Sequence, residues 1–187
     1  MSSRFDIRAT PIAGLQLLQR RPIGDNRGYL ERLYCADELQ AVISGKAIVQ
    51  VNHTLTPGRG TVRGMHFQHA PHAEVKFVSC LRGEVFDVAV DLRRNSPTFL
   101  RWHAEILSAN NYRTLVIPEG FAHGFQTLTE DCEMLYFHTA AYQPGAEAGL
   151  HAQDPTLAIQ WPQVVAELSL RDAAHPMLSE GFSGVAV

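Results

Sequence analysis

Short strand-like runs fill most of the chain, and this pattern limits the fold more than any other feature. Apolar or alternating segments are separated by breaks that contain Gly or Pro, and long helical periodicity is scarce. Many short strands at regular spacing are typical of a β-sandwich or barrel. The sequence therefore predicts an all-β fold. The predicted strands are 15–20, 47–54, 61–68, 74–81, 84–92, 102–107, 113–117, 123–128 and 133–139.

Two short helical segments interrupt this pattern. One is predicted from Asp37 to Ser44, with Asp37 as its N-cap and Gly45 at its end. A second helical turn is predicted to begin at Ser169, in the sequence SLRDAAHP. No linker, repeat or change of composition divides the chain, so we expect one domain over residues 1–187.

Charge and cysteine content narrow the classes of function. The formal net charge is -3, which provides no basic field to hold nucleic acid. The three cysteines are odd in number and widely spaced, as is typical of reduced thiols in a cytoplasm. No apolar run is long enough for a signal peptide or a membrane span. We therefore expect a soluble cytoplasmic protein that binds neither nucleic acid nor a membrane.

The predicted strand EVFDVAVDL at 84–92 carries two carboxylates on one face. Asp87 and Asp91 alternate with apolar positions, and such a face is ordinarily solvated. Neighbouring predicted strands weaken that interpretation, because Lys76 shares a face with apolar residues and His66 shares a face with Gln68. If these faces line one interior, it holds His, Lys and Asp together, which is typical of functional sites.

His66 is the first candidate for such chemistry. It can be a hydrogen-bonded structural histidine or a general base. A base needs a carboxylate that fixes its tautomer, and Asp172 is the best distant candidate. The sequence SLRD at 169–172 is also a capping-box pattern, in which Asp172 would bond to the backbone N–H of Ser169 instead. The residues alone leave both roles open.

Further side chains also have a structural and a functional interpretation. Lys76 is either an edge-strand lysine that opposes aggregation or an ammonium that stabilises an oxyanion. Tyr136 is either a core aromatic or an acid, and His123 is equally open between the two kinds of role. Tyr142 follows a predicted strand, where its ring could stack on a flat ligand. Arg63 has a guanidinium fork suited to phosphate.

A series of motifs resembles one known family. In chain order they are DNRG at 25–28, QVNHT at 50–54, GTVRGMHFQ at 60–68, KFV at 76–78, RGEVFDVAVDLRRNSPTF at 82–99, LSANN at 107–111, IPEGFAHGF at 117–125, LY at 135–136, DP at 154–155, WP at 161–162 and RD at 171–172. With these motifs the chain resembles the nucleotide-sugar 3,5-epimerase family, whose type is dTDP-4-dehydrorhamnose 3,5-epimerase. The resemblance covers about residues 5 to 178 and implies a cupin-type jelly roll.

The resemblance implies roles for individual residues. His66 matches the general base and Asp172 its partner, while Lys76 matches the residue that stabilises the enolate and Tyr136 the general acid. The positions that match contacts to the nucleotide-sugar are Arg27, Gln50, Asn52, Arg63, His123, Tyr142, Glu147 and Arg171. The implied reaction inverts C3, C5 or both in a nucleotide-linked 4-keto-6-deoxyhexose, without a metal or cofactor. The family also implies a homodimer in which the partner subunit supplies the Arg27 segment.

One position departs from the family pattern. The family usually has an acidic residue five positions after the arginine of DxRG, whereas this chain has Arg32 there and Glu31 one position earlier. A strand bulge could correct the register of Glu31. If Arg32 faces the base instead, a guanidinium can only donate, which suits cytosine better than thymine N3–H. A CDP-linked sugar is therefore an alternative to a dTDP-linked one.

Two other classes of function fit parts of the sequence. A metal-dependent cupin could draw ligands from His66, His69, His72, Glu74 and His123. Lys76 would repel a cation there, and the closely spaced histidine pair of metal cupins is replaced by His66 and Gln68. A non-catalytic binding module would keep Tyr142 and the arginines, but it would not need the set of His66, Lys76, Tyr136 and Asp172. Their joint presence favours an enzyme.

Overall fold

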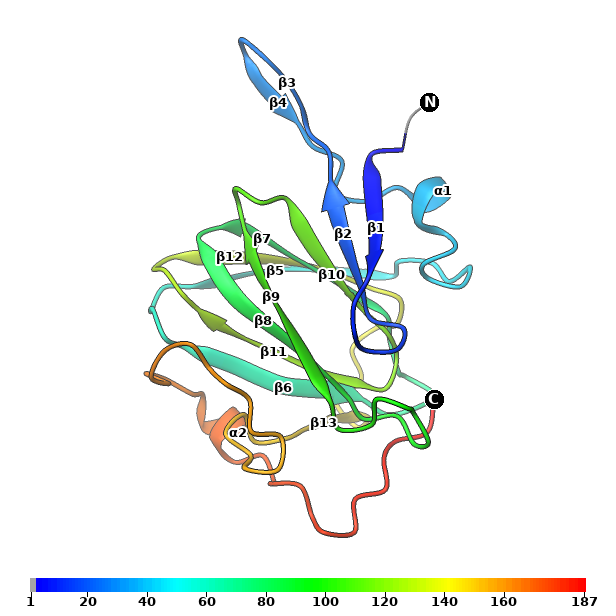
Figure 1. Ribbon diagram of the computed structural model, residues 1–187, viewed down its shortest axis with the longest axis vertical. Helices are drawn as coiled ribbons and strands as arrows, with labels where there is room; N and C mark the ends of the chain where they lie inside the picture. The colour runs from blue at the N-terminus through cyan, green and yellow to red at the C-terminus, as the bar shows by residue number, and fades with distance from the viewer. Residues whose placement is uncertain (1–2) are drawn as a thin grey trace.

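The computed structural model describes residues 3–187, and it is a sandwich of two antiparallel sheets (Figure 1). The six-stranded sheet contains, in spatial order, β1 (Phe5–Ala9), β2 (Gln16–Arg20), β10 (Arg113–Ile117), β7 (Lys76–Arg82), β12 (Cys132–His138) and β5 (Gln50–Thr56). The five-stranded sheet contains β13 (Glu147–Gly149), β6 (Val62–Gln68), β11 (Phe121–Thr127), β8 (Glu84–Asp91) and β9 (Trp102–Ser108). This confirms the predicted all-β fold.

Three apolar clusters hold the layers together. The central one lies between the sheets, where Val78 and Leu115 of one sheet pack with Ala89 and Phe125 of the other. A second covers the outer face of the five-stranded sheet with the C-terminal segment, and a third packs the segment after residue 33 on the other sheet. Both outer faces are thus covered in part, although the outer side of β5, beside the site, stays exposed.

A separate hairpin leaves the body of the sandwich. It consists of β3 (Ile23–Asp25) and β4 (Gly28–Leu30), which pair only with each other. Figure 1 shows this hairpin projecting away from both sheets. All of its residues are exposed, including the apolar Ile23, Tyr29 and Leu30. Its position matters below, because Arg27 lies at its turn.

The helices differ in part from the prediction. α1 spans only Ala36–Leu39, and its N-cap is Cys35, whose side chain makes no capping bond. The prediction of Asp37 as the cap of a helix reaching Ser44 was wrong, since Asp37 lies inside the first turn and the chain continues as turns. α2 spans Leu170–Ala173, and Ser169 caps it by accepting a hydrogen bond from the Asp172 N–H at 3.0 Å. This second helical turn confirms the prediction.

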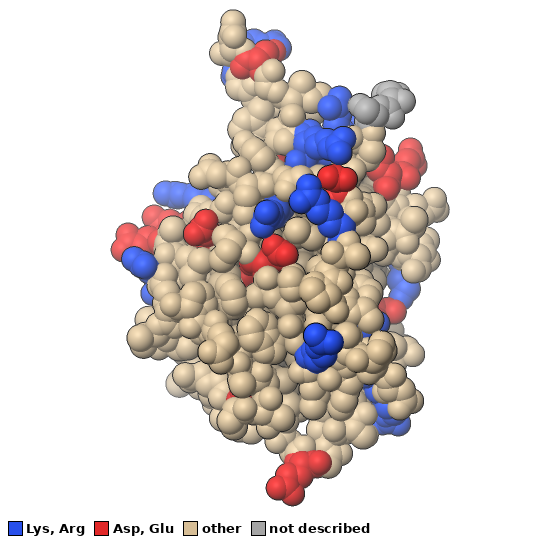
Figure 2. Space-filling model, viewed as in Figure 1, with Lys and Arg blue, Asp and Glu red and all other residues tan. Residues whose placement is uncertain are grey.

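The acidic face of β8 is buried. Asp87 and Asp91 are both 0% exposed, so the solvated interpretation was wrong. Asp87 bonds to His123 across the sheet, and Asp91 accepts hydrogen bonds from Arg93, Ser96 and Thr98. Only Asp87 lies beneath the site described below, because Asp91 is bound to the loop that follows β8. On the face shown in Figure 2, acidic and basic side chains are interspersed without a continuous basic patch.

A register shift in β6 changes which side chains share a face. His66 pairs with His123 of β11, but Arg63 pairs with Phe125, so β6 has one residue more than its partner between these pairs. Strict alternation would place Arg63 on the face opposite His66, but the extra residue turns both side chains towards the same cavity. Gly64 lies within the irregular stretch with φ of 137°, and a Cβ there would lie 2.5 Å from the Gly124 Cα. The shift therefore depends on glycine at this position.

Replacing Gly64 with Ala is expected to destabilise the fold strongly. Overpacking alone costs about 1–3 kcal/mol, and the positive φ adds to that cost. We expect a loss of at least about 2 kcal/mol in the free energy of unfolding, measured by denaturant titration. Gly145→Ala is the matched control, because a Cβ added at Gly145 would have no atom within 4 Å. Equal stability of the two variants would contradict the packing argument.

Candidate active site

A cavity of about 210 Å³ opens between the two sheets. β6 and β11 supply one wall, and β5, β7 and β12 supply the other. Its lining residues are Gln50, Asn52, Thr54, Arg63, His66, Phe67, Gln68, Glu74, Lys76, His123, Phe125, Tyr136, His138, Tyr142, Glu147 and Arg171. The fold thus brings together most of the predicted site residues from segments far apart in the sequence.

His66 and Asp172 form a hydrogen-bonded pair at this cavity. The His66 Nε2 lies 2.7 Å from the Asp172 Oδ1, and the Gly64 N–H donates to the other carboxylate oxygen at 3.2 Å. Asp172 is 3% exposed and lies behind the imidazole. Of the two roles that the sequence left open, the carboxylate takes the one facing His66, so only the Ser169 half of the capping box forms.

The environment of Asp172 favours its charged form. Burial raises the pKa of this carboxyl, but the hydrogen bond and charge of His66, together with the Gly64 N–H, more than offset burial and lower the pKa from 3.8 to about 2. An ionised Asp172 accepts the proton on His66 Nε2. The tautomer then leaves Nδ1 of His66 with a free lone pair.

This lowered pKa predicts a pH-dependent contribution to stability. A carboxyl group whose pKa is lower in the folded than in the unfolded protein stabilises the fold at pH values above its pKa in the unfolded chain. That stabilisation is lost as the pH falls through its pKa in the folded protein. Asp172→Asn should therefore cost about 2 kcal/mol of unfolding free energy above pH 4, and the cost should shrink as pH falls from 3.8 towards 2. Urea titrations across this range, with exposed Asp37→Asn as the control, measure the difference. A cost independent of pH would contradict the prediction.

The opposite wall carries Lys76 and Tyr136. Tyr136 packs against the central core, and burial raises the pKa of its phenol. The Lys76 ammonium lies 2.9 Å from Glu74, so its position is held by a carboxylate rather than left free. His66 belongs to the five-stranded sheet, whereas these two residues belong to the six-stranded sheet. A molecule in the cavity therefore has His66 on one side and Tyr136 on the other.

His138 was missed as a site residue, and Glu74 was considered only as a metal ligand. The His138 Nδ1–H donates to Glu74 at 2.8 Å, and the ring stacks on Tyr136 with centroids 6.1 Å apart. Burial raises the pKa of Glu74, but the bond from His138 and the charge of Lys76 outweigh it and leave the pKa below its usual value. Period-two alternation could have found both, since Glu74 lies two residues before Lys76 and His138 two after Tyr136.

His123 is held from below by Asp87. The His123 Nε2 lies 2.9 Å from the Asp87 Oδ2, and both side chains are buried. Burial raises the pKa of Asp87, although the nearby His123 opposes this. The His123 ring meets Tyr136 edge to face at 6.2 Å between centroids. His123 thus contacts side chains of both walls of the cavity.

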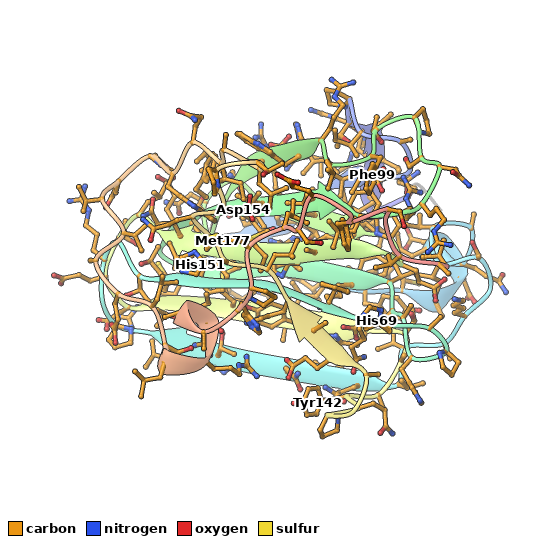
Figure 3. All side chains as sticks on the ribbon, turned by 90° about the horizontal axis from the view of Figure 1, so that it is seen from below. His69, Phe99, Tyr142, His151, Asp154 and Met177 are labelled. Carbon is orange, nitrogen blue, oxygen red and sulfur yellow. The ribbon has the colours of Figure 1, made fainter. Side chains whose placement is uncertain are left out.

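The mouth of the cavity is formed by exposed polar contacts. The Tyr142 hydroxyl donates to Glu147 at 2.8 Å, and the Arg171 guanidinium donates to the same carboxylate at 3.2 Å. The Gln50 side chain accepts from the Tyr142 N–H at 2.9 Å. The Tyr142 ring is 47% exposed and lies at the outer edge of the sandwich in Figure 3. An exposed ring there is free to stack on a planar group.

Arg27 and Arg32 are not brought to this cavity within one chain. Arg27 pairs with Asp25 at the hairpin turn, and its side chain is 89% exposed. Arg32 pairs with Glu38, and Glu31 lies 2.8 Å from the buried Arg20. The expectation that Arg32 contacts the base is therefore not met by the chain's own cavity.

The metal-cupin ligand set does not assemble either. Neither His69 nor His72 lines the cavity, and Glu74 is engaged by Lys76 and His138. Within residues 3–187, the one group of three or more clustered metal-type ligands is His66, Asp172 and His175. The proposed set of ligands for a metal-dependent cupin was wrong: His66, Glu74 and His123 line the cavity, but they do not form a cluster of metal ligands, and His69 and His72 lie outside it.

Comparison with known proteins identifies the family. The family model described as dTDP-4-dehydrorhamnose 3,5-epimerase matches residues 9–180. The chain belongs to the dTDP-4-dehydrorhamnose 3,5-epimerase family. It is therefore an epimerase, within the class of isomerases.

Individual members of the dTDP-4-dehydrorhamnose 3,5-epimerase family support this assignment. The enzyme of that name from Salmonella typhimurium is 43% identical over 175 residues, which cover 92% of this chain and 95% of the relative. The crystal structure of a dTDP-6-deoxy-D-glucose-3,5-epimerase from Legionella pneumophila, in complex with dTDP-4-keto-L-rhamnose, has a TM-score of 0.87 and 40% identity, covering 92% of each chain. A 3'-monoepimerase from Streptomyces bikiniensis, in complex with dTDP-quinovose, has a TM-score of 0.81 and 30% identity, covering 90% of this chain and 85% of that one.

The lengths of the helices show whether any of them could span a membrane. Across residues 3–187, no helix is long and apolar enough to cross a bilayer.

Proposed function

We propose that this protein inverts C3, C5 or both in a dTDP-linked 4-keto-6-deoxyhexose by removing a proton from one face of the sugar and returning a proton to the other. The observation that carries the proposal is the placement of the His66–Asp172 pair and Tyr136 on opposite walls of one cavity. Inversion at carbon needs a base and an acid on opposite faces of the ring.

The steps follow from the acidity of carbons next to a ketone. His66 Nδ1 accepts a proton from C3 or C5, and the C–H electron pair delocalises onto the C4 ketone oxygen as an enolate. Lys76, held by Glu74, stabilises the developing negative charge. Tyr136 then donates its phenolic proton to the same carbon from the opposite wall, while the electron pair returns from the enolate oxygen. Asp172 stabilises the imidazolium that forms on His66.

Binding of the nucleotide diphosphate is assigned to residues around these four. Arg63 and Arg171 supply donors for phosphate and sugar oxygens, with His123, Gln50, Asn52 and Glu147 as further polar contacts. Tyr142 stacks on the base at the cavity mouth. Whether one or both carbons are inverted depends on how the ring can turn inside the cavity, and the family includes a 3'-monoepimerase as well as 3,5-epimerases.

The nucleotide is proposed to be dTDP rather than CDP. Arg32 pairs with Glu38 and does not line the cavity, and the family model is that of a dTDP-sugar epimerase. Turnover of matched dTDP- and CDP-linked 4-keto-6-deoxy sugars, followed by NMR, tests this choice. We expect clear preference for the dTDP compound, and a preference for the CDP compound would restore the assignment of Arg32 to the base.

The hairpin is proposed to complete the site of a second copy. Its exposed apolar residues and its projection from the body suit an interface, and Arg27 at its turn would then reach the partner's cavity (Figure 1). We therefore propose a cytoplasmic homodimer of one-domain chains spanning 1–187. A sedimentation mass near that of one 20.7 kDa chain would contradict the dimer.

A further inference from the structure

His175 lies beside the proposed catalytic pair without a role in the reaction. Its Nε2 is buried and has no hydrogen-bond partner, and it lies 3.9 Å from the Asp172 Oδ1. The ring meets that of His66 edge to face, with centroids 5.5 Å apart. It occupies space left by Gly149, where a Cβ would lie 2.4 Å from His175 Nε2. A buried imidazole nitrogen without a partner is costly, which suggests that it can accept a ligand.

We propose that His66, Asp172 and His175 form a binding site for a divalent cation of the zinc class, and that the bound cation inhibits the enzyme. One ligand atom of each residue lies within 4.8 Å of the other two. Two imidazoles and a carboxylate are donors that zinc prefers, and a three-residue set leaves a fourth position for water. Tetrahedral bond lengths place ligand atoms about 3.4 Å apart, so the three side chains need to shift by about an ångström.

A second cavity gives an ion a route to this pair. It has a volume of about 270 Å³ and is lined by both His66 and Asp172, with Thr61, Glu167 and Ser169 among its other residues. The nearby Arg171 guanidinium, 3.3 Å from the His66 Nε2, opposes a cation. While bonded to Glu147, it also lies 3.6 Å from the Asp172 Oδ1, so it must move outward when the ion binds, which its 55% exposed side chain allows.

The inhibition follows from the tautomer of His66 and rests on the proposed role of His66 as the base. Without metal, the ring carries its proton on Nε2, towards Asp172, and Nδ1 has the lone pair. A cation on Nε2 requires the lone pair there, so the proton of the neutral ring moves to Nδ1. The nitrogen that would accept the sugar proton is then occupied. The substrate cavity itself stays open, so turnover should fall while substrate binding is retained.

Zinc binding to the intact 187-residue chain tests the site independently of the reaction. Equilibrium dialysis should give one Zn²⁺ per chain, and His175→Gln should weaken the affinity at least about tenfold, an effect seen even for indirect metal partners. His69→Gln, at an exposed histidine, should leave the affinity unchanged. Mg²⁺, which prefers oxygen ligands, should not compete. Equal zinc affinity in His175→Gln and the unchanged protein, or no stoichiometric binding, would overturn the proposal.

Kinetic measurements test whether zinc bound at this site lowers the rate of epimerisation. Added Zn²⁺ should lower kcat with little change in KM, and His175→Gln should keep its metal-free activity while losing most of this sensitivity. Zinc that raises only KM would overturn the tautomer mechanism, because it would indicate binding in the substrate cavity. If the protein binds zinc through His175 but has no epimerase activity, the metal site stands and the proposed function fails.

Discussion

His66→Ala is expected to abolish epimerisation and the exchange of sugar hydrogens with solvent. The substitution removes the imidazole that lies on the cavity wall opposite Tyr136 and is bonded to the buried Asp172 carboxylate. General base catalysis is worth about 10²–10⁴-fold, so exchange in deuterated water should slow by about a thousandfold or more. The measurement is the appearance of deuterium at C3 and C5, followed by NMR.

The control for this variant separates chemistry from folding and binding. Affinity for the dTDP product should stay close to that of the unchanged protein. Stability should fall as it does in Asp172→Asn, because the buried carboxylate loses its bond to His66. Asp172→Asn should slow exchange less than His66→Ala does, since it leaves the imidazole in place but removes the group that sets its tautomer. A normal exchange rate in His66→Ala would refute the assignment of the base.

Tyr136→Phe is expected to separate exchange from inversion. The variant keeps the aromatic packing against the core and removes only the hydroxyl, so the fold should be preserved. His66 can still remove a proton and return a deuteron from solvent to the same face. We therefore expect deuterium in recovered substrate, with the inverted product reduced by about 10²-fold or more.

Two other results for Tyr136→Phe would contradict its assignment as the acid alone. Loss of both exchange and inversion would indicate that Tyr136 takes part in forming the enolate, and unchanged inversion would place the acid elsewhere. His138→Ala is a useful companion variant, because His138 stacks on Tyr136 and lines the same wall. If Tyr136 is the acid, His138→Ala should retain inversion.

Alternation predicted the strands well because each strand in a sandwich has one face towards the core. The runs at 84–92 and 113–117 match β8 and β10 within a residue. The short hairpin β3–β4 was not predicted, since its exposed residues have no buried face to impose a pattern. The length of α1 was also misjudged, because turns after Leu39 bury Ile43 without a helix.

The sequence predicted some residues of the site but not how they are arranged. The resemblance named His66, Lys76, Tyr136 and Asp172, but periodicity could not show that a register shift turns Arg63 towards the same cavity. No local signal distinguishes a carboxylate that caps its own helix from one that bonds to a strand more than a hundred residues away. That choice depends on tertiary packing of α2 against β6.

The most direct test of the account is NMR of dTDP-4-keto-6-deoxyglucose in deuterated water with the unchanged protein. The arrangement of His66 and Tyr136 predicts deuterium at C3, C5 or both, together with a product in which the labelled carbon is inverted. Titration of the same sample with dTDP confirms that the nucleotide binds. Binding of the nucleotide-sugar without any exchange or inversion would contradict the proposed function and leave the cavity as a binding site only.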